Sequence, residues 1–129
     1  MADPISIATG AVRVISTTIP VVESIVTTIN RIMDAPNEVR DLGLQVQGLA
    51  TVLSQLRDKA PAMMLSEQLV LTLDTCLAGC TKMEAGVAKW ANKSAFTLAV
   101  LKAGQVKSYK AQILDYQQAV EFSMQASHV

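Results

Sequence analysis

The chain has 129 residues, which is the size of one ordinary domain rather than two. Half of the residues are apolar, 17% are charged and 4% are aromatic, a composition that argues against a disordered chain. Eleven basic residues balance eleven acidic ones, and this formal net charge of zero disfavours a nucleic acid partner. We therefore expect residues 1–129 to form a single domain with an apolar core.

The N-terminal region is apolar, but charged residues interrupt it. Arg13, Glu23 and Arg31 divide the region into runs shorter than the roughly 18–20 residues that a bilayer-spanning helix needs. No basic segment precedes the apolar run, so a secretory signal is not expected either. Cys76 and Cys80 are four positions apart without a nearby histidine, which favours two buried thiols over a zinc site or a redox pair. The expected location is the cytoplasm.

Prolines and a glycine divide the chain into four expected helices. Asp3-Pro4 is typical of an N-cap followed by proline at the first helical position, and Asp34-Ala35-Pro36 repeats this device before a second helix. Pro61 is expected to separate the second helix from the third, and Gly104 is the expected weak point before the fourth. No segment sustains an alternation of period two, so no strand is expected.

Apolar residues recur at every third or fourth position in each segment, as on one face of an α-helix. The fourth stripe is less regular than the other three. The stripes are Ile5, Ala8, Val12, Ile15, Ile19, Val22, Val26, Ile29 and Met33; Val39, Leu42, Val46, Leu49, Leu53 and Leu56; Leu69, Leu73, Cys76, Cys80, Met83, Val87 and Trp90; and Val106, Tyr109, Ile113, Tyr116, Val120 and Met124. Helices joined by short loops bury such stripes in a bundle. We therefore expect an all-α fold, an antiparallel bundle of four helices or of five.

The first segment carries a second apolar stripe beside the first. It consists of Ile7, Ala11, Val14, Val21, Ile25 and Ile32, with Thr18 and Thr28 in the gaps. The two stripes together cover roughly 160–200° of the helix, whereas a bundle helix needs only about three apolar positions in seven. Two interpretations are open: the helix is central and contacts several neighbours, or part of the arc meets a membrane or a second protomer. Pro20 lies on the polar face, where it is expected to bend the helix.

Five lysines fall within a stretch that contains no acidic residue. They are Lys89, Lys93, Lys102, Lys107 and Lys110, between Glu84 and Asp115. One interpretation is a solvated helix face; the other is a patch for an anionic membrane, where each basic residue near the surface contributes about 1 kcal/mol. A nucleic acid partner is not expected, because the stretch has no arginine and only Trp90 and Tyr109 could stack on bases.

No motif in the sequence predicts catalysis. His128 is the only histidine and lies one residue from the end, so no Ser/His or Cys/His pair is expected. The glycines are scattered and form neither of the common phosphate-binding fingerprints, and the carboxylates lack the pattern of a metal-binding helical bundle. We expect no enzyme activity, no cofactor, no metal and no small-molecule substrate.

Four segments follow the pattern of one known domain. Residues 1–8 read MADPISIA, residues 34–42 read DAPNEVRDL, residues 73–77 read LDTCL, and the last segment begins at Val106. They resemble the start, the DAPxE[IV]R[ED]L segment, the third helix and the last helix of the fungal HeLo-like N-terminal domain, which heads many fungal NLR-like (STAND) NTPases and ankyrin-repeat proteins. The second segment is the most specific match, and the resemblance is loose after residue 90. Where the family often has Trp-Pro-Leu-Lys, this chain has Ala-Val-Leu-Lys at residues 99–102.

This resemblance implies an α-helical bundle related to the HeLo cell-death domains and to the four-helix domain of the mixed-lineage-kinase-like necroptosis executor. It also implies membrane targeting through the N-terminal helix, self-association into homo-oligomers and loss of membrane integrity after activation. The expected function is a regulated, pore-forming effector of programmed cell death or heterokaryon incompatibility, a form of fungal innate immunity. We expect it to move from the cytoplasm to the plasma membrane, and to be the N-terminal part of a longer protein.

We expect the membrane and oligomer contacts on the first helix and the contacts with anionic lipids on the five lysines. The helix residues are Ile5, Ile7, Ala8, Ala11, Val12, Val14, Ile15, Ile19, Val21 and Val22. The alternative is an adaptor bundle that binds other proteins through a helix-in-groove contact, without membrane activity. A third alternative is an inert bundle that caps a larger protein.

Overall fold

Four long helices dominate the computed structural model, which describes residues 4–60 and 65–126. The elements are α1 (Pro4–Asn30), α2 (Asn37–Lys59), α3 (Glu67–Ala88), the 3₁₀ helix η2 (Lys89–Asn92), the π-helical turn η3 (Thr97–Leu101) and α4 (Ala103–Ala126). The described residues contain no strand. The predicted all-α bundle is therefore confirmed, and η2 and η3 are short elements that the periodicity did not predict.

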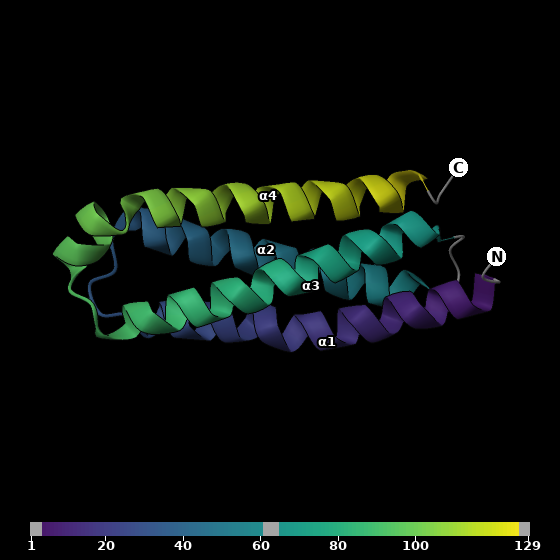
Figure 1. Cartoon of the computed structure of the whole chain (residues 1–129), viewed down its shortest axis with the longest axis horizontal. Helices are drawn as coiled ribbons and strands as arrows, with labels where there is room; N and C mark the ends of the chain where they lie inside the picture. The colour runs from purple at the N-terminus through teal and green to yellow at the C-terminus, as the bar shows by residue number, and fades with distance from the viewer. Residues whose placement is uncertain (1–3, 61–64, 127–129) are drawn as a thin grey trace.

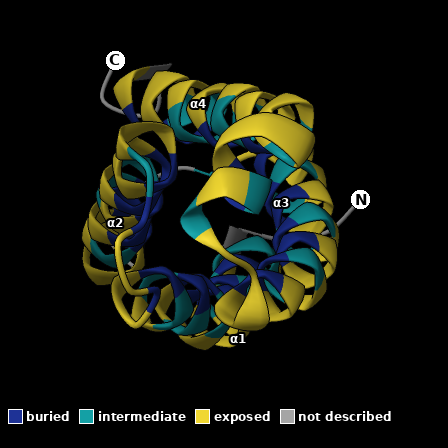
Figure 2. Cartoon of the chain, turned by 90° about the vertical axis from the view of Figure 1, so that its left-hand side faces the viewer, coloured by how far each residue is buried: buried dark blue, intermediate teal, exposed yellow. Residues whose placement is uncertain are grey.

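Consecutive long helices run in opposite directions, as Figure 1 shows. α1 packs against both α2 and α3, and α4 packs against α2 and, more lightly, against α3. Seen from the end in Figure 2, α2 and α3 lie on one diagonal of the bundle, and α1 and α4 lie on the other. Two of the contacting pairs, α1 with α3 and α2 with α4, are therefore parallel, and the antiparallel arrangement applies to helices that are consecutive in the chain.

The connection between α1 and α2 differs from the prediction. Asp34 has a φ of 55°, in the left-handed region that Asp tolerates better than most residues. Pro36 lies outside the helix as its N-cap residue, and α2 begins at Asn37. The Pro36 carbonyl accepts hydrogen bonds from the N–H groups of Val39 (3.0 Å) and Arg40 (3.1 Å). Asp34 is therefore a turn residue, because the chain needs a left-handed position to reverse there, and it does not cap the helix as expected.

Two other helix starts depend on local chemistry. Pro4 begins α1, as predicted, whereas Asp3, its expected cap, and Pro61, the expected break after α2, lie outside the described residues. Ser66 caps α3, since its Oγ accepts a hydrogen bond from the Leu69 N–H at 3.2 Å. A cap of this kind stabilises a helix by about 1 kcal/mol.

The short helices η2 and η3 connect α3 to α4. Leu98 is buried and fixes η3 to the core, while the Ser94 Oγ accepts a hydrogen bond from the Thr97 N–H at 3.1 Å. The Lys102 N–H donates to the Thr97 carbonyl at 3.0 Å, which closes the π turn. α4 begins directly afterwards, so Gly104 is its second residue and does not precede it.

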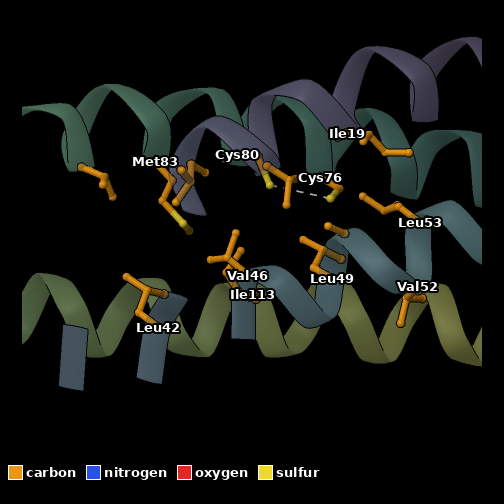
Figure 3. Packing of buried hydrophobic residues seen from close by; sticks show 14 of the residues in the cluster. Ile19, Leu42, Val46, Leu49, Val52, Leu53, Cys76, Cys80, Met83 and Ile113 are labelled. Carbon is orange, nitrogen blue, oxygen red and sulfur yellow. Dashed lines mark hydrogen bonds between the residues drawn. The ribbon is translucent and has the colours of Figure 1, made fainter. Parts of the chain in front are cut away.

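The core runs along the axis of the bundle, where buried residues of the four long helices meet (Figures 2 and 3). Every stripe residue predicted for the second and third helices is buried. In α4 the four aliphatic stripe residues are buried, whereas the two tyrosines are half-buried. The stripes of α2 and α3 are thus confirmed in full, and that of α4 is confirmed for its aliphatic members.

Glycines of α3 make room for the tyrosines of α4. A Cβ at Gly79 would overlap the Tyr116 Oη, and a Cβ at Gly86 would overlap the Tyr109 Oη. The Tyr109 ring also stacks on Trp90, with 5.6 Å between the ring centroids. Burial raises the pKa of both tyrosines above the ordinary value. The two glycines therefore fix the register between α3 and α4 by the space that they leave.

Candidate functional site

The apolar arc of α1 is covered along most of the helix and uncovered at its start. Of the ten residues expected to contact a membrane, four are buried, five are half-buried and one is exposed. The buried ones are Ala11, Ile15, Ile19 and Val22; the half-buried ones are Ile7, Ala8, Val12, Val14 and Val21; and Ile5 is 79% exposed. Buried residues come from both stripes, because α1 packs against both α2 and α3. The interpretation as a central helix accounts for the arc from Ala11 onward, and free apolar surface is left on the first two turns.

α1 is long and apolar enough to cross a membrane, by length and composition. The expectation that no such segment exists was therefore wrong. Arg13 and Glu23 fall inside the helix but are exposed on its polar face, whereas Arg31 and Met33 lie beyond its end at Asn30. Met33, an expected stripe residue, is 85% exposed for the same reason. In the most apolar stretch of α1, 28% of the residues are buried in the bundle.

The middle of α1 is a weak point of the helix. Pro20 has no N–H, so the carbonyl four residues earlier loses its helical hydrogen bond. Just before it, the Thr17 Oγ1 donates to the Arg13 carbonyl at 3.0 Å, and the Thr18 Oγ1 donates to the Val14 carbonyl at 2.7 Å. Back-bonding of this kind slightly destabilises helices and often bends them. α1 nevertheless continues through Pro20 to Asn30, and the buried Ile19 and Val22 on either side of the proline hold the helix in the bundle.

The five lysines lie at one end of the bundle, where α3 passes into η2 and α4 begins (Figure 1). Lys89, Lys93 and Lys107 are exposed, and Lys102 is half-buried. None of these four lysines forms an ion pair with another residue of the described part of the chain. We call these four residues the lysine patch.

Lys110 differs from the lysine patch because α2 supplies it with acidic partners. Its Nζ lies 2.7 Å from the Glu38 Oε2 and 3.9 Å from the Asp41 Oδ2. Lys110 and Glu38 are 72 positions apart, so the stretch without acidic residues in the sequence is not free of them in space. The expected five-lysine patch is therefore reduced to four free cations.

The lysine patch and the start of α1 lie at opposite ends of the bundle (Figure 1). α1 has 27 residues, and a helix of that length spans about 40 Å. The start of α1, expected to contact lipid, and the lysines, expected to contact anionic headgroups, are therefore far apart in the closed bundle. With the bundle upright on its lysine end, the start of α1 can reach the same membrane only if α1 leaves its place.

An exposed apolar tip lies beside the lysine patch, and the periodicity did not predict it. Phe96, Val100 and Leu101 are 70%, 55% and 73% exposed on and next to η3. The available signal was the largely apolar run 95–101, which lies between Lys93 and Lys102 without a helical stripe of its own. We call Phe96, Val100 and Leu101 the apolar tip.

Cys76 and Cys80 are free, buried thiols whose Sγ atoms lie 3.9 Å apart (Figure 3). The hydrogen bond to Cys80 and burial raise the pKa of Cys76 above the ordinary value, so this thiol stays protonated. The prediction of two buried thiols on a core stripe is confirmed. Across residues 4–60 and 65–126, no group of three or more His, Cys, Asp or Glu residues could hold a metal ion.

Two surface grooves lie between the helices, the first with a mixed polar and apolar wall and the second with a mostly apolar one. One, of about 520 Å³, lies between α1 and α2 and is lined by residues such as Val26, Ile32 and Leu44. The other, of about 490 Å³, lies between α2, η3 and α4 and is lined by residues such as Leu98 and Val106. The residues that line them include no serine, cysteine or histidine, so these grooves suit the binding of apolar groups better than nucleophilic catalysis.

Comparisons with known proteins bear on the family of the chain. No curated protein and no solved structure matches it. The family model described as the N-terminal domain of the pigment biosynthesis cluster protein PigL matches residues 2–126, which is nearly the whole length. The chain therefore belongs to this fungal family of PigL N-terminal domains.

Proposed function

We propose that this domain is a self-associating effector of programmed cell death or incompatibility that moves from the cytoplasm to the plasma membrane and disrupts it through α1. The observation that carries the proposal is α1 itself, which has the length and composition of a membrane helix, is uncovered at Ile5 and is weakened at Pro20. Membership in the fungal family of PigL N-terminal domains is loosely consistent with the HeLo-like resemblance. That resemblance supplies the cell-death role.

Packing, more than helical preference, holds α1 in the closed bundle. The helix is rich in Ile, Val and Thr, which form helices less readily than Ala, Leu or Lys. Residues 4–19 bury Ala11, Ile15 and Ile19, and burial of one large aliphatic side chain contributes about 1.5–3 kcal/mol. The hydrocarbon core of a membrane offers these side chains an equally apolar environment. Transfer to lipid therefore recovers the free energy that release from the bundle loses.

Release of α1 would also create the surface for self-association. The start of α1 lies beside the end of α2 and the start of α3 (Figure 1). The core at that end includes Leu53, Leu56, Leu69 and Leu73, which are fully or almost fully buried. Without α1 this apolar surface meets water, and large exposed apolar surfaces bind one another. A second copy of the domain can bury this surface, so insertion of α1 into the membrane and oligomerisation of the domain are coupled.

Dye release from liposomes that contain anionic lipid tests the proposal. Ile5→Asp changes an exposed position and Val12→Asp a half-buried one, so both variants are expected to fold. Ile15→Asp is unsuitable, because Ile15 is fully buried and a charge there unfolds the bundle. Leu71→Asp is the matched control, since Leu71 is 59% exposed on α3.

The expected order of leakage rates follows the depth of each charge in the membrane. An acidic side chain near the centre of a membrane helix costs about 2.5–3.5 kcal/mol, so Val12→Asp should leak at least about tenfold more slowly than the parent. Ile5→Asp should be slowed less, and Leu71→Asp should match the parent. Circular dichroism confirms that each variant is folded. Equal leakage rates for folded Val12→Asp and the parent would contradict the proposal.

An adaptor role is the second candidate, and the groove between α1 and α2 favours it. Its mixed wall, with Arg40 and Gln47 beside the exposed Leu44 (73%), suits an amphipathic helix of another protein. Flotation with liposomes separates the two functions. The membrane effector rises with the lipid, whereas an adaptor stays in the soluble fraction.

A further inference from the structure

We infer that the apolar tip and the lysine patch together form a docking surface for an anionic lipid bilayer, separate from α1 and at the other end of the molecule. This inference rests on the proposed function for the membrane as partner. It adds a first contact that does not require the bundle to open. The step from docking to leakage then belongs to α1 alone.

The apolar tip exposes its side chains from an ordered turn. Leu98 is 1% exposed, whereas Phe96 and Leu101 on either side of it are 70% and 73% exposed. The turn is fixed at its start, where the Thr97 N–H donates to the Ser94 Oγ at 3.1 Å. Leu98 anchors the segment in the core, so the tip residues stay outside while Leu98 stays inside. Exposed aromatic and aliphatic side chains gathered in this way mark a contact surface.

The lysine patch brackets the apolar tip. Lys93 and Lys102 flank it directly in the chain, Lys89 precedes it in η2, and Lys107 follows it in the first turns of α4. Glu84, the last acidic residue of α3, lies five positions before Lys89. Each basic residue close to an anionic leaflet strengthens binding roughly fivefold. Four free lysines are therefore enough to direct this end of the bundle to a negative surface.

Two other acidic residues at this end share a basic partner, Lys110. Glu38 and Asp41 of α2 lie within 4 Å of the Lys110 Nζ, at 2.7 and 3.9 Å. Asp34, in the connection between α1 and α2, follows Arg31 by three positions. Lys110 and Arg31 together offset two of these three negative charges, so the four lysines of the patch leave a net charge of +3 among these groups.

The combination of features favours lipid over other partners. Apolar side chains alone would fit a protein groove, and lysines alone would fit any polyanion. A bilayer offers negative headgroups directly above an apolar layer, which matches exposed apolar side chains ringed by lysines.

Flotation of the full chain with liposomes tests the apolar part of the surface. The vesicles contain phosphatidylcholine with phosphatidylserine, or phosphatidylcholine alone. Phe96→Ser with Leu101→Ser removes two tip side chains, and Leu44→Ser with Phe122→Ser is the matched control, since Leu44 and Phe122 are 73% and 72% exposed elsewhere on the bundle. We expect the tip variant to bind phosphatidylserine vesicles at least about tenfold more weakly. The control should bind like the parent.

A second pair of variants tests the charge. Lys93→Gln with Lys107→Gln should weaken binding to phosphatidylserine vesicles by about twentyfold, whereas Lys59→Gln with Lys82→Gln, at exposed positions elsewhere, should change it little. Binding should also fall as salt is added, because screening weakens interactions between exposed charges.

The outcomes separate this inference from the proposed function. A parent that does not float, or tip and lysine variants that float as well as the parent, would overturn the docking surface. Val12→Asp should float normally and fail to leak. If the tip variant loses binding but Val12→Asp leaks like the parent, the role of α1 is wrong and the docking surface stands.

Discussion

Replacing Gly86 by alanine tests how the contact between α3 and α4 is built. A Cβ at this position would overlap the Tyr109 Oη and would lie 3.2 Å from the Tyr109 Cζ. Overpacking of this kind costs about 1–3 kcal/mol, while alanine gains about 1 kcal/mol over glycine inside a helix. We therefore expect Gly86→Ala to lower the free energy of unfolding by up to about 2 kcal/mol.

Tyr109→Phe removes the overlapping oxygen and one hydrogen bond, which the Gln105 Nε2 donates to it at 3.0 Å. Alone, this substitution costs about 0.5–1.5 kcal/mol. When Gly86→Ala is added to it, the closest contact left is the one of 3.2 Å to Cζ, which a small shift relieves. The gain in helix propensity then dominates, and Gly86→Ala becomes stabilising by about 0.5–1 kcal/mol. A change of sign between the two backgrounds is the mark of a pairwise clash.

Gly79 and Tyr116 provide the matched control. Here the Tyr116 Cζ would lie only 2.8 Å from a new Cβ, so removal of the hydroxyl leaves a clash behind. We expect Gly79→Ala to destabilise the protein both alone and with Tyr116→Phe. Urea unfolding followed by circular dichroism gives each free energy of unfolding, provided that the denaturant slope stays constant. The reasoning is refuted if Gly86→Ala has the same effect with and without Tyr109→Phe, or if it stabilises the parent.

Three further predictions concern α1 and the tyrosines. Pro20→Ala should stabilise the domain by up to about 3 kcal/mol and slow dye release, because alanine restores the helical N–H that proline lacks. Calorimetry measures the stability and liposome leakage measures the dye release. Faster leakage would speak against a hinge at Pro20. Ile29→Cys with Gly43→Cys should form a disulfide, since a Cβ at Gly43 would lie 3.8 Å from the Ile29 Cβ. The oxidised form should be more stable than the reduced form by about 3 kcal/mol, and equal melting temperatures would contradict this. Burial raises the pKa of Tyr109 and Tyr116, so the free energy of unfolding should be full below pH about 10 and fall as the pH rises further. Tyr109→Phe with Tyr116→Phe should make this fall shallower when unfolding is measured as a function of pH. An unchanged slope would exclude the tyrosines as its cause.

Periodicity predicted the fold well where a helix has one buried face. Val39 to Leu56 in α2 and Leu69 to Trp90 in the third stripe are all buried, because spacing along one helix is a local property that the sequence carries directly. The wide arc of α1 could not be divided in advance, because its coverage depends on having two neighbours, α2 and α3. Ile5 at the start of α1 is exposed, although it continues the stripe that is buried at Ile15.

Contacts between segments that are distant in the sequence account for the features that periodicity did not predict. The Glu38 partner of Lys110 and the match of Gly86 with Tyr109 depend on which helices become neighbours and in which register, and neither follows from spacing within one helix. The apolar tip was missed for a related reason, because the segment from Phe96 to Leu101 is too short to show a helical stripe. The tip side chains are exposed because Leu98 is the buried residue of this turn.

Docking through the apolar tip would fix how far α1 can reach into a membrane. With the bundle upright on the tip, residues 21–30 of α1 span about 15 Å and η3 lies beyond the end of α1 (Figure 1), so Pro20 lies more than about 15 Å above the surface. Residues 4–19 span about 24 Å, so their release brings the start of α1 less than about 9 Å below the surface. The hydrocarbon core is about 30 Å thick, whereas the whole of α1 is about 40 Å long. A hinge at Pro20 therefore lets α1 reach at most the outer part of one leaflet, and a pore requires Val22, Ile25 and Ile29 to leave the core as well.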